Sequence, residues 1–196
     1  MLARLCLLSL GILGCARDDG DPPSPEVRWL RPAETAPPGH APGAQHRLVG
    51  TSPDGTRDFA LVLASGDEVM TALRDLARAE RIGNARISAV GAVRDAEVAS
   101  FSIARRQYKA MQFAEQLEVV SLAGDITVAP DGAPSVHVHA ALGRADGSMV
   151  GGHLIHATAR PTLEVYVTAY PEPIHTRVTG ETGTQVMDLG VATARR

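Results

Sequence analysis

The chain has 196 residues, of which 44% are apolar and only 4% aromatic, and its formal net charge is −3. This length and balance suit one globular domain with extensions, and its core must be built from Val, Leu, Ile and Ala. Neither the net charge nor any run of basic residues indicates electrostatic binding to nucleic acid, so that class of function is disfavoured.

The first fifteen residues are typical of an export signal. A short basic region, Met1–Arg4, precedes an apolar run, Leu5–Leu13, that is too short to span a bilayer comfortably. The run leads into Ile-Leu-Gly-Cys, which resembles a bacterial lipobox with Cys15 as the lipidated residue; an ordinary secretory signal is the alternative. A lipid on Cys15 would anchor the protein in the cell envelope. Because Ala16 rather than Asp follows the cysteine, we expect the periplasmic side of the outer membrane.

Residues 16–45 contain seven of the thirteen prolines, with Gly, Ala and acidic residues between them. A segment of this composition does not bury enough apolar surface to order itself. We therefore expect an extended, disordered tether between the anchor and a folded domain at residues 46–190, with 191–196 as a short tail.

The expected domain begins with strands at His46–Val49 and Phe59–Leu63, followed by the most clearly patterned helix of the chain. Ser65 and Glu68 match a capping box at its start, and Gly83 is the expected stop. The apolar face of this helix consists of Val69, Leu73, Leu76 and Ala77.

Strand patterns dominate after residue 85. The expected strands are Ile87–Val93, with either a bulge or a close backbone contact at Gly91, then Glu97–Ile103 after a turn near Arg94 and Asp95, Leu117–Val128, and Leu163–Ala169. Residues 105–116 fit either a short helix or an irregular strand. Their cluster of basic and aromatic residues (Arg105, Arg106, Tyr108, Lys109) fits either an anion contact or a solvated edge.

Four of the seven histidines lie between residues 135 and 156. His137 and His139 are two apart in a Val/Ala-rich strand pattern, so their imidazoles project from the same face. After a turn signal at Asp146-Gly147, Gly151 and Gly152 precede His153, and these glycines let the backbone approach the histidine pair closely. Three imidazoles from two neighbouring strands can hold one divalent ion and leave a coordination position open. The alternative is that the histidines are polar residues of a sheet surface.

The motifs from Ser121 to Val165 resemble the PPC (plants and prokaryotes conserved) domain. They are, in order, S-L-x-G at 121–124, D-G-x-P at 131–134, H-x-H at 137–139, D-G at 146–147, G-G-H-L at 151–154 and T-x-E-V at 162–165. The resemblance extends over roughly residues 46–189. In plants the domain is joined to AT-hook motifs, and its prokaryotic members are often labelled provisionally as DNA-binding.

The resemblance implies an α/β fold of the α+β kind, with a largely antiparallel sheet and one main amphipathic helix, assembled as a homotrimer. It also implies that His137, His139 and His153 bind a divalent metal ion, commonly zinc. The fold is distantly similar to that of acetolactate decarboxylase, a zinc enzyme with three histidine ligands. The chain departs from the family in its lipobox and Pro-rich segment, and it has no Arg-Gly-Arg-Pro core of an AT-hook.

Two main functions remain open at this point. The first is a metal-binding, oligomeric module that binds a small ligand or a partner in the cell envelope. The second is a zinc-dependent lyase or hydrolase acting on a small carbonyl substrate, for which Glu118 and Glu164 are the candidate acids or bases. His156, at the third position after His153, falls on the opposite face of a regular strand and is expected to support a ligand rather than bind the ion. DNA binding is the third and least favoured alternative.

Overall fold

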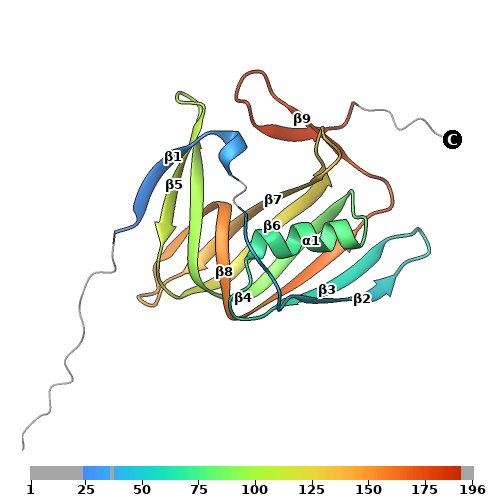
Figure 1. Cartoon of the computed structure of the whole chain (residues 1–196), viewed down its shortest axis with the longest axis horizontal. Helices are drawn as coiled ribbons and strands as arrows, with labels where there is room; N and C mark the ends of the chain where they lie inside the picture. Colours follow the sequence, from blue (N-terminus) through green and yellow to red (C-terminus); the bar gives the residue numbers. More distant parts are fainter. Residues whose placement is uncertain (1–23, 36–37, 191–196) are drawn as a thin grey trace, which may run out of the picture.

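A single ten-stranded sheet forms the body of the computed structural model, which describes residues 24–35 and 38–190 (Figure 1). Every strand pair is antiparallel except for one parallel pairing of β9 with β6. The strands are β1 (Glu26–Leu30), β2 (Gln45–Thr51), β3 (Arg57–Leu63), β4 (Ala85–Ser102), β5 (Gln107–Phe113), β6 (Leu117–Val128), β7 (Pro134–Gly143), β8 (Met149–Ala169), β9 (His175–Val178) and β10 (Gln185–Asp188). The helices are the 3-10 turn η1 (Pro32–Glu34) and α1 (Val69–Ala79). The expected fold, a largely antiparallel sheet with one amphipathic helix, is confirmed.

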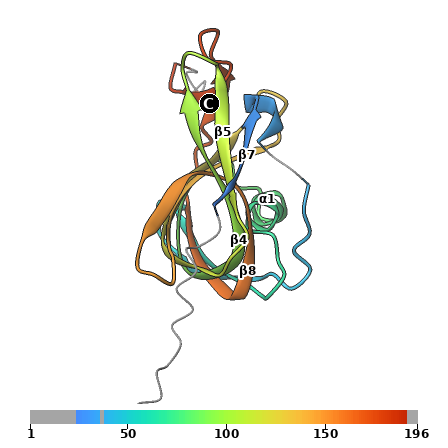
Figure 2. The same ribbon diagram turned by 90° about the vertical axis from the view of Figure 1, so that its left-hand side faces the viewer.

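The sheet curls back on itself between its two longest strands, β4 and β8. The sheet follows the order β1-β5-β4-β6-β7-β8-β3-β2, and β4 also pairs directly with β8. Strands β4, β6, β7 and β8 therefore form a closed circuit of hydrogen-bonded neighbours, visible end-on in Figure 2. Closure removes exposed edges from this part of the sheet.

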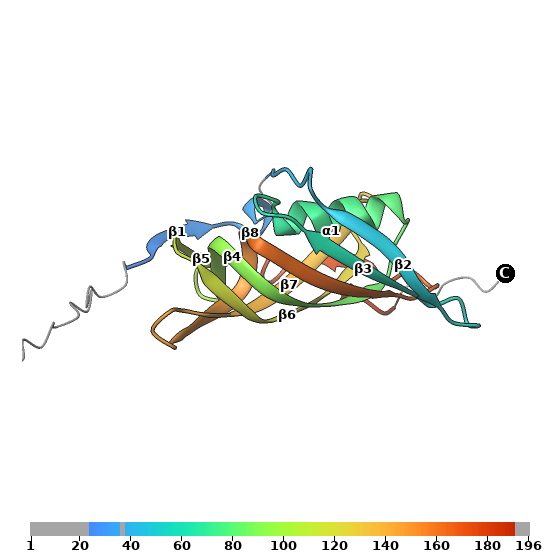
Figure 3. The ribbon, with the colours of Figure 1, turned by 90° about the horizontal axis from the view of Figure 1, so that it is seen from below.

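Helix α1 covers one face of the curled sheet (Figures 1 and 3). Its predicted apolar face is buried, and it packs with residues of β3, β4, β6, β7 and β8 in one core. The predicted cap is wrong. Glu68 itself is the N-cap, because its carboxylate accepts hydrogen bonds from the backbone N–H groups of Met70 at 3.0 Å and Thr71 at 2.6 Å. The helix ends at Ala79, before the predicted Gly83, and Arg81 takes the left-handed conformation at φ 52°.

The strand pattern differs from expectation at Arg94. The turn expected near Arg94 is absent, because β4 runs without interruption through this position and bends by register shifts against β8. The register shift of β4 against β6 lies at Gly91, as predicted. Residues 105–116 are mainly the strand β5, which excludes the helical alternative for this segment.

The expectation of a disordered tether is wrong for residues 24–35. Strand β1 lies within this range and pairs along its whole length with β5. Leu30 is buried beside Ala110 and Ile155, and Arg28 forms an ion pair with Glu97. Pairing with an open edge strand and burial of one leucine thus order a segment whose composition alone does not predict order. The predicted signal, Cys15 and the tail at 191–196 lie outside the described residues. Within the described residues, no helix is both long and apolar enough to cross a membrane.

Candidate metal centre

Two adjacent strands bring the three predicted histidines together. His137 and His139 alternate along β7 with the buried Val138 and Ala140, so their rings project from the face opposite the core. His153 of β8 lies directly opposite His139 in the strand register. The three ring centroids are 5.1 to 5.5 Å apart, and one ligand atom from each residue lies within 4.8 Å of the others.

Two glycines allow the strands to approach one another at this cluster. Gly124 of β6 lies opposite Val138, and a Cβ there would stand 2.0 Å from the carbonyl oxygen of His137. Gly152 precedes His153 with φ +149°, and a Cβ there would stand 2.6 Å from the carbonyl oxygen of Ala99. No other residue fits either position without movement of the backbone.

The chemistry of the donors fits a metal ion. Nδ1 of His153 is buried and has no hydrogen-bond partner among the described residues, although such atoms are nearly always paired. Burial, and then the neighbouring His137 and His139, lower the pKa of His153 to about 4. Burial and His137 also lower the pKa of His139. Both rings are therefore neutral at physiological pH, which is the form that binds metals.

Two residues beside the cluster were not predicted. Tyr108 of β5 stacks on the His153 ring with centroids 4.8 Å apart and planes at 19°, and Phe101 packs edge-on against Tyr108. Asp125 of β6 places Oδ2 3.7 Å from Nδ1 of His137, and burial raises the pKa of Asp125. Sequence reasoning considered Tyr108 only as part of a basic cluster. The strand pairing that aligns Asp125 with His137 depends on the register of β6 and β7, which the sequence leaves undefined.

A groove of about 1360 Å³ opens onto His137, His153 and Tyr108. It is walled by residues of η1, α1, the β6–β7 hairpin and the β9–β10 hairpin. The β4–β5 turn and the β9–β10 loop meet at one point, where Arg106 Nη2 donates to the carbonyl oxygen of Gly180 at 2.6 Å. Because the groove opens onto these three side chains, a small ligand can reach the histidine cluster through it.

Neither predicted catalytic carboxylate lies at the cluster. Glu118 is exposed on β6 opposite Gly143, whereas the residue opposite His137 is Asp125. Glu164 is exposed on β8, opposite Val62 on one side and Val90 on the other. The strand geometry thus gives neither residue a place beside an ion held by the three histidines.

The basic residues near Tyr108 form no common anion site. Arg105, Arg106 and Lys109 are all exposed. Arg105 lies over the ring of Trp29 at 4.7 Å, and Arg106 bonds Gly180 as described above. These contacts stabilise the β4–β5 turn, and only Tyr108 of the four faces the histidines.

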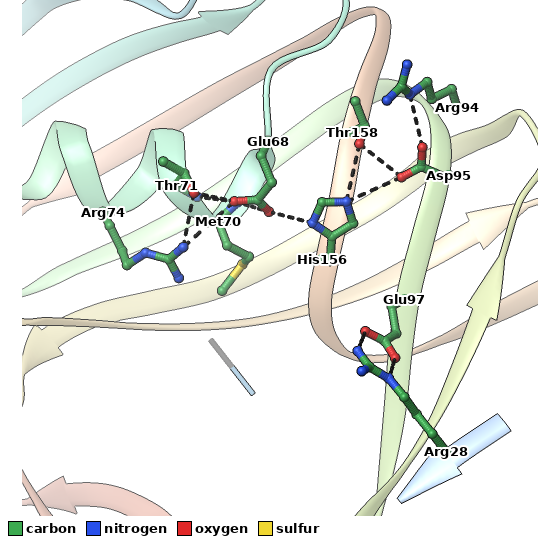
Figure 4. A network of polar contacts seen from close by, with 10 residues as sticks. All are labelled: Arg28, Glu68, Met70, Thr71, Arg74, Arg94, Asp95, Glu97, His156 and Thr158. Atoms are coloured by element: carbon green, nitrogen blue, oxygen red, sulfur yellow. Dashed lines mark hydrogen bonds and ion pairs between the residues drawn. The ribbon is translucent and has the colours of Figure 1, made fainter. Parts of the chain in front are cut away.

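His156 belongs to a separate polar network, shown in Figure 4. Its Nδ1 lies 3.5 Å from Glu68 and its Nε2 lies 3.5 Å from Asp95. The prediction that it faces away from His153 is wrong, because the register shifts at Ile155: Leu154 lies opposite Val98, but His156 lies opposite Glu97. One extra residue returns His156 to the face of His153. It still does not join the group of possible ligands.

The fold and the sequence identify the family. The model of the Plants and Prokaryotes Conserved domain, abbreviated PCC or PPC, matches residues 50–171. The chain belongs to this family. The matched range contains all three histidines, and the resemblance noted in the sequence is confirmed.

Several solved structures are similar to this chain. A plant- and prokaryote-conserved protein of Pyrococcus horikoshii is 25% identical, with a TM-score of 0.64 over 74% of this chain and 94% of its own. A metal-containing protein of Archaeoglobus fulgidus is 28% identical, with a TM-score of 0.63 over 74% of this chain and 96% of its own. A Ralstonia eutropha protein, to which DNA binding is attributed provisionally, is 28% identical, with a TM-score of 0.64 over 71% of this chain and 94% of its own. No curated protein matches the chain.

Proposed function

We propose that this PPC protein binds one divalent metal ion, zinc, through His137, His139 and His153. The observation that carries the proposal is the convergence of three imidazole donors within 4.8 Å, one of them with a buried, unpaired nitrogen. The metal-containing relative from Archaeoglobus fulgidus supports it.

Zinc suits this donor set. Neutral imidazole is a preferred ligand of zinc and of neighbouring transition metals, and three histidines leave the fourth tetrahedral position open. The groove leads to His137 and His153, so an external ligand can occupy that position. When bound, the ion supplies Lewis acidity at this point.

We propose further that the protein acts as an oligomeric module that binds a small ligand or a partner in the bacterial envelope. The family resemblance is the reason to propose a homotrimer. The Ile-Leu-Gly-Cys sequence is the reason to propose an anchor at Cys15 and a place on the periplasmic side of the outer membrane. DNA binding is not proposed, because the chain is acidic overall and has no basic run.

The second candidate function is a zinc-dependent lyase or hydrolase that acts on a small carbonyl substrate. The groove at the histidines and the carboxylate of Asp125 favour it, because such an enzyme needs substrate access and an acid or base near the ion. Asp125 is better placed for this role than Glu118 or Glu164.

Metal analysis by mass spectrometry tests the main proposal. The full chain, supplied with zinc and then freed of excess, should retain about one zinc per chain. His137→Ala and His153→Ala should lose it, and His175→Ala, an exposed histidine of β9, should retain it. Absence of zinc from the unchanged chain would contradict the proposal.

A further inference from the structure

Asp125 is set against His137 by the strand register. Residue 125 of β6 lies directly opposite residue 137 of β7, with both side chains on the face that carries the three histidines. The close approach at Gly124 fixes this alignment, since a Cβ there would meet the His137 carbonyl oxygen. Asp125 Oδ2 stands 3.7 Å from Nδ1 of His137, and the Asp125 side chain is 26% exposed.

Asp125 differs from the other acidic residues that line the groove. Asp75 forms an ion pair with Arg78 on the exposed surface of α1. Asp131 accepts a hydrogen bond from the backbone N–H of Ala133 in the β6–β7 turn. Within residues 24–35 and 38–190, the side-chain carboxylate of Asp125 has one charged or hydrogen-bonding side chain within contact distance, which is that of His137. Its carboxylate is thus available to this histidine.

We infer that Asp125 is a positioning residue for the metal centre: when the ion binds, its carboxylate accepts a hydrogen bond from the N–H at Nδ1 of His137 and so leaves Nε2 for the ion. A histidine that binds a metal through one nitrogen usually donates the other N–H to a carboxylate or carbonyl, and this contact fixes the tautomer and the orientation of the ring. The inference rests on the proposed metal binding. It adds a residue that neither the family match nor the histidine spacing indicates.

The test measures the zinc affinity of the full chain by competition with a chromophoric chelator. Asp125→Ala should weaken zinc binding about 10- to 100-fold, the usual effect of losing such a partner. Asp125→Asn keeps an oxygen acceptor and should lose less than Asp125→Ala. Asp75→Asn removes the same charge from the same groove without touching a histidine, and should bind zinc like the unchanged chain.

The tautomer of His137 gives a second readout that a general loss of stability does not change. Long-range proton–nitrogen NMR spectra of the zinc-loaded chain should show Nδ1 of His137 protonated and Nε2 bound to the metal. In Asp125→Ala, the residual zinc complex should lose this strict preference.

Three results separate the possibilities. Zinc binding by the unchanged chain with unaltered affinity in Asp125→Ala would overturn the positioning role alone. A loss of zinc affinity far above 100-fold in Asp125→Ala, together with a metal-bound Nδ1 of His137 in the unchanged chain, would mean that Asp125 is itself a ligand. That result would also overturn the positioning role. If the unchanged chain binds no zinc, the proposed function and this inference both fail.

Discussion

His153 combines the chemical features expected of a metal ligand in one residue. It is partly buried, its ring stacks on Tyr108, and its Nδ1 has no partner among the described residues. Burial keeps the ring neutral, so no proton needs to be displaced from it near neutral pH. Leaving a buried nitrogen unpaired costs stability, and an ion bound to that nitrogen would remove the cost.

Gly124 sets the register on which His137 and Asp125 depend. We predict that Gly124→Ala lowers the free energy of unfolding by about 3 kcal/mol or prevents folding, because its Cβ would stand 2.0 Å from a backbone oxygen. Gly180→Ala is the control, since a Cβ there meets nothing within 4 Å. Urea unfolding of both variants measures the difference. Equal stabilities would show that the strands are not held closely here.

The Glu68–His156 pair should make stability depend on pH. Hydrogen bonding to Glu68 raises the pKa of His156 against the effect of burial. Burial alone would raise the pKa of Glu68, but contacts from His156, Thr71 and Met70 lower it. His156 therefore stabilises the fold below about pH 6.5 and loses this effect as the pH rises through its raised pKa. Glu68 stabilises above about pH 4.5 and loses its effect as the pH falls through its lowered pKa.

The corresponding variant is His156→Gln. Relative to the unchanged protein, His156→Gln should lower the free energy of unfolding by about 1 to 3 kcal/mol, the scale of a hydrogen bond to a charged group. The difference should be largest between about pH 4.5 and 6.5. Unfolding curves from pH 4 to 9 check this. A deficit that stays constant across that range would show that His156 acts only through packing.

At the scale of elements, the composition of the chain does not predict the role of β1. Arg28 of β1 bonds Glu97 of β4 through two contacts of 2.6 Å, and Glu97 is only 4% exposed. Trp29 of the same strand packs under Arg105. The strand therefore closes the edge of β5 and neutralises a buried carboxylate.

We predict that Arg28→Ala destabilises the protein by about 1 to 3 kcal/mol, because it leaves a buried charge unpaired. The expected loss of stability is smaller than for a fully buried ion pair because the Arg28 side chain is 52% exposed. Adding Glu97→Gln should recover part of the loss, since the remaining group is neutral. A thermal-unfolding comparison of the two variants decides this, and a double variant less stable than Arg28→Ala would contradict it.

The sequence was informative where local pattern and chemistry agree. The apolar face of α1, the extent of β6 and the proximity of the three histidines all follow from periodicity and spacing. Prediction from the sequence failed where contacts between distant parts of the chain determine the structure. Pairing with β5 orders β1. Register shifts against β8 allow β4 to continue through Arg94, and an extra residue at Ile155 places His156 on the same face as His153. Asp125 was missed for the same reason, since its neighbour lies twelve positions away across a hairpin.

At the scale of the whole molecule, the proposal joins a PPC domain to an anchored N-terminus. Cys15→Ser should move the protein from the membrane fraction to the soluble fraction of bacterial cells, because it removes the residue that we propose carries the lipid. Cys6→Ser is the control, since Cys6 precedes the predicted cleavage site. Equal membrane association of Cys15→Ser and the unchanged chain would rule out the lipid anchor.

The proposed assembly has its own test. Light scattering on the purified protein should give three times the mass of one chain if the family resemblance extends to a homotrimer. A mass equal to that of a single chain at micromolar concentration would contradict it. Neither result changes the account of the histidine cluster, which lies on strands of one chain.

The most direct test of the metal centre is anomalous diffraction at the zinc absorption edge from crystals of the zinc-loaded protein. We predict one anomalous peak per chain, in contact with nitrogens of His137, His139 and His153. No peak at these histidines, or a peak only at another place such as the Glu68–His156 pair, would contradict it.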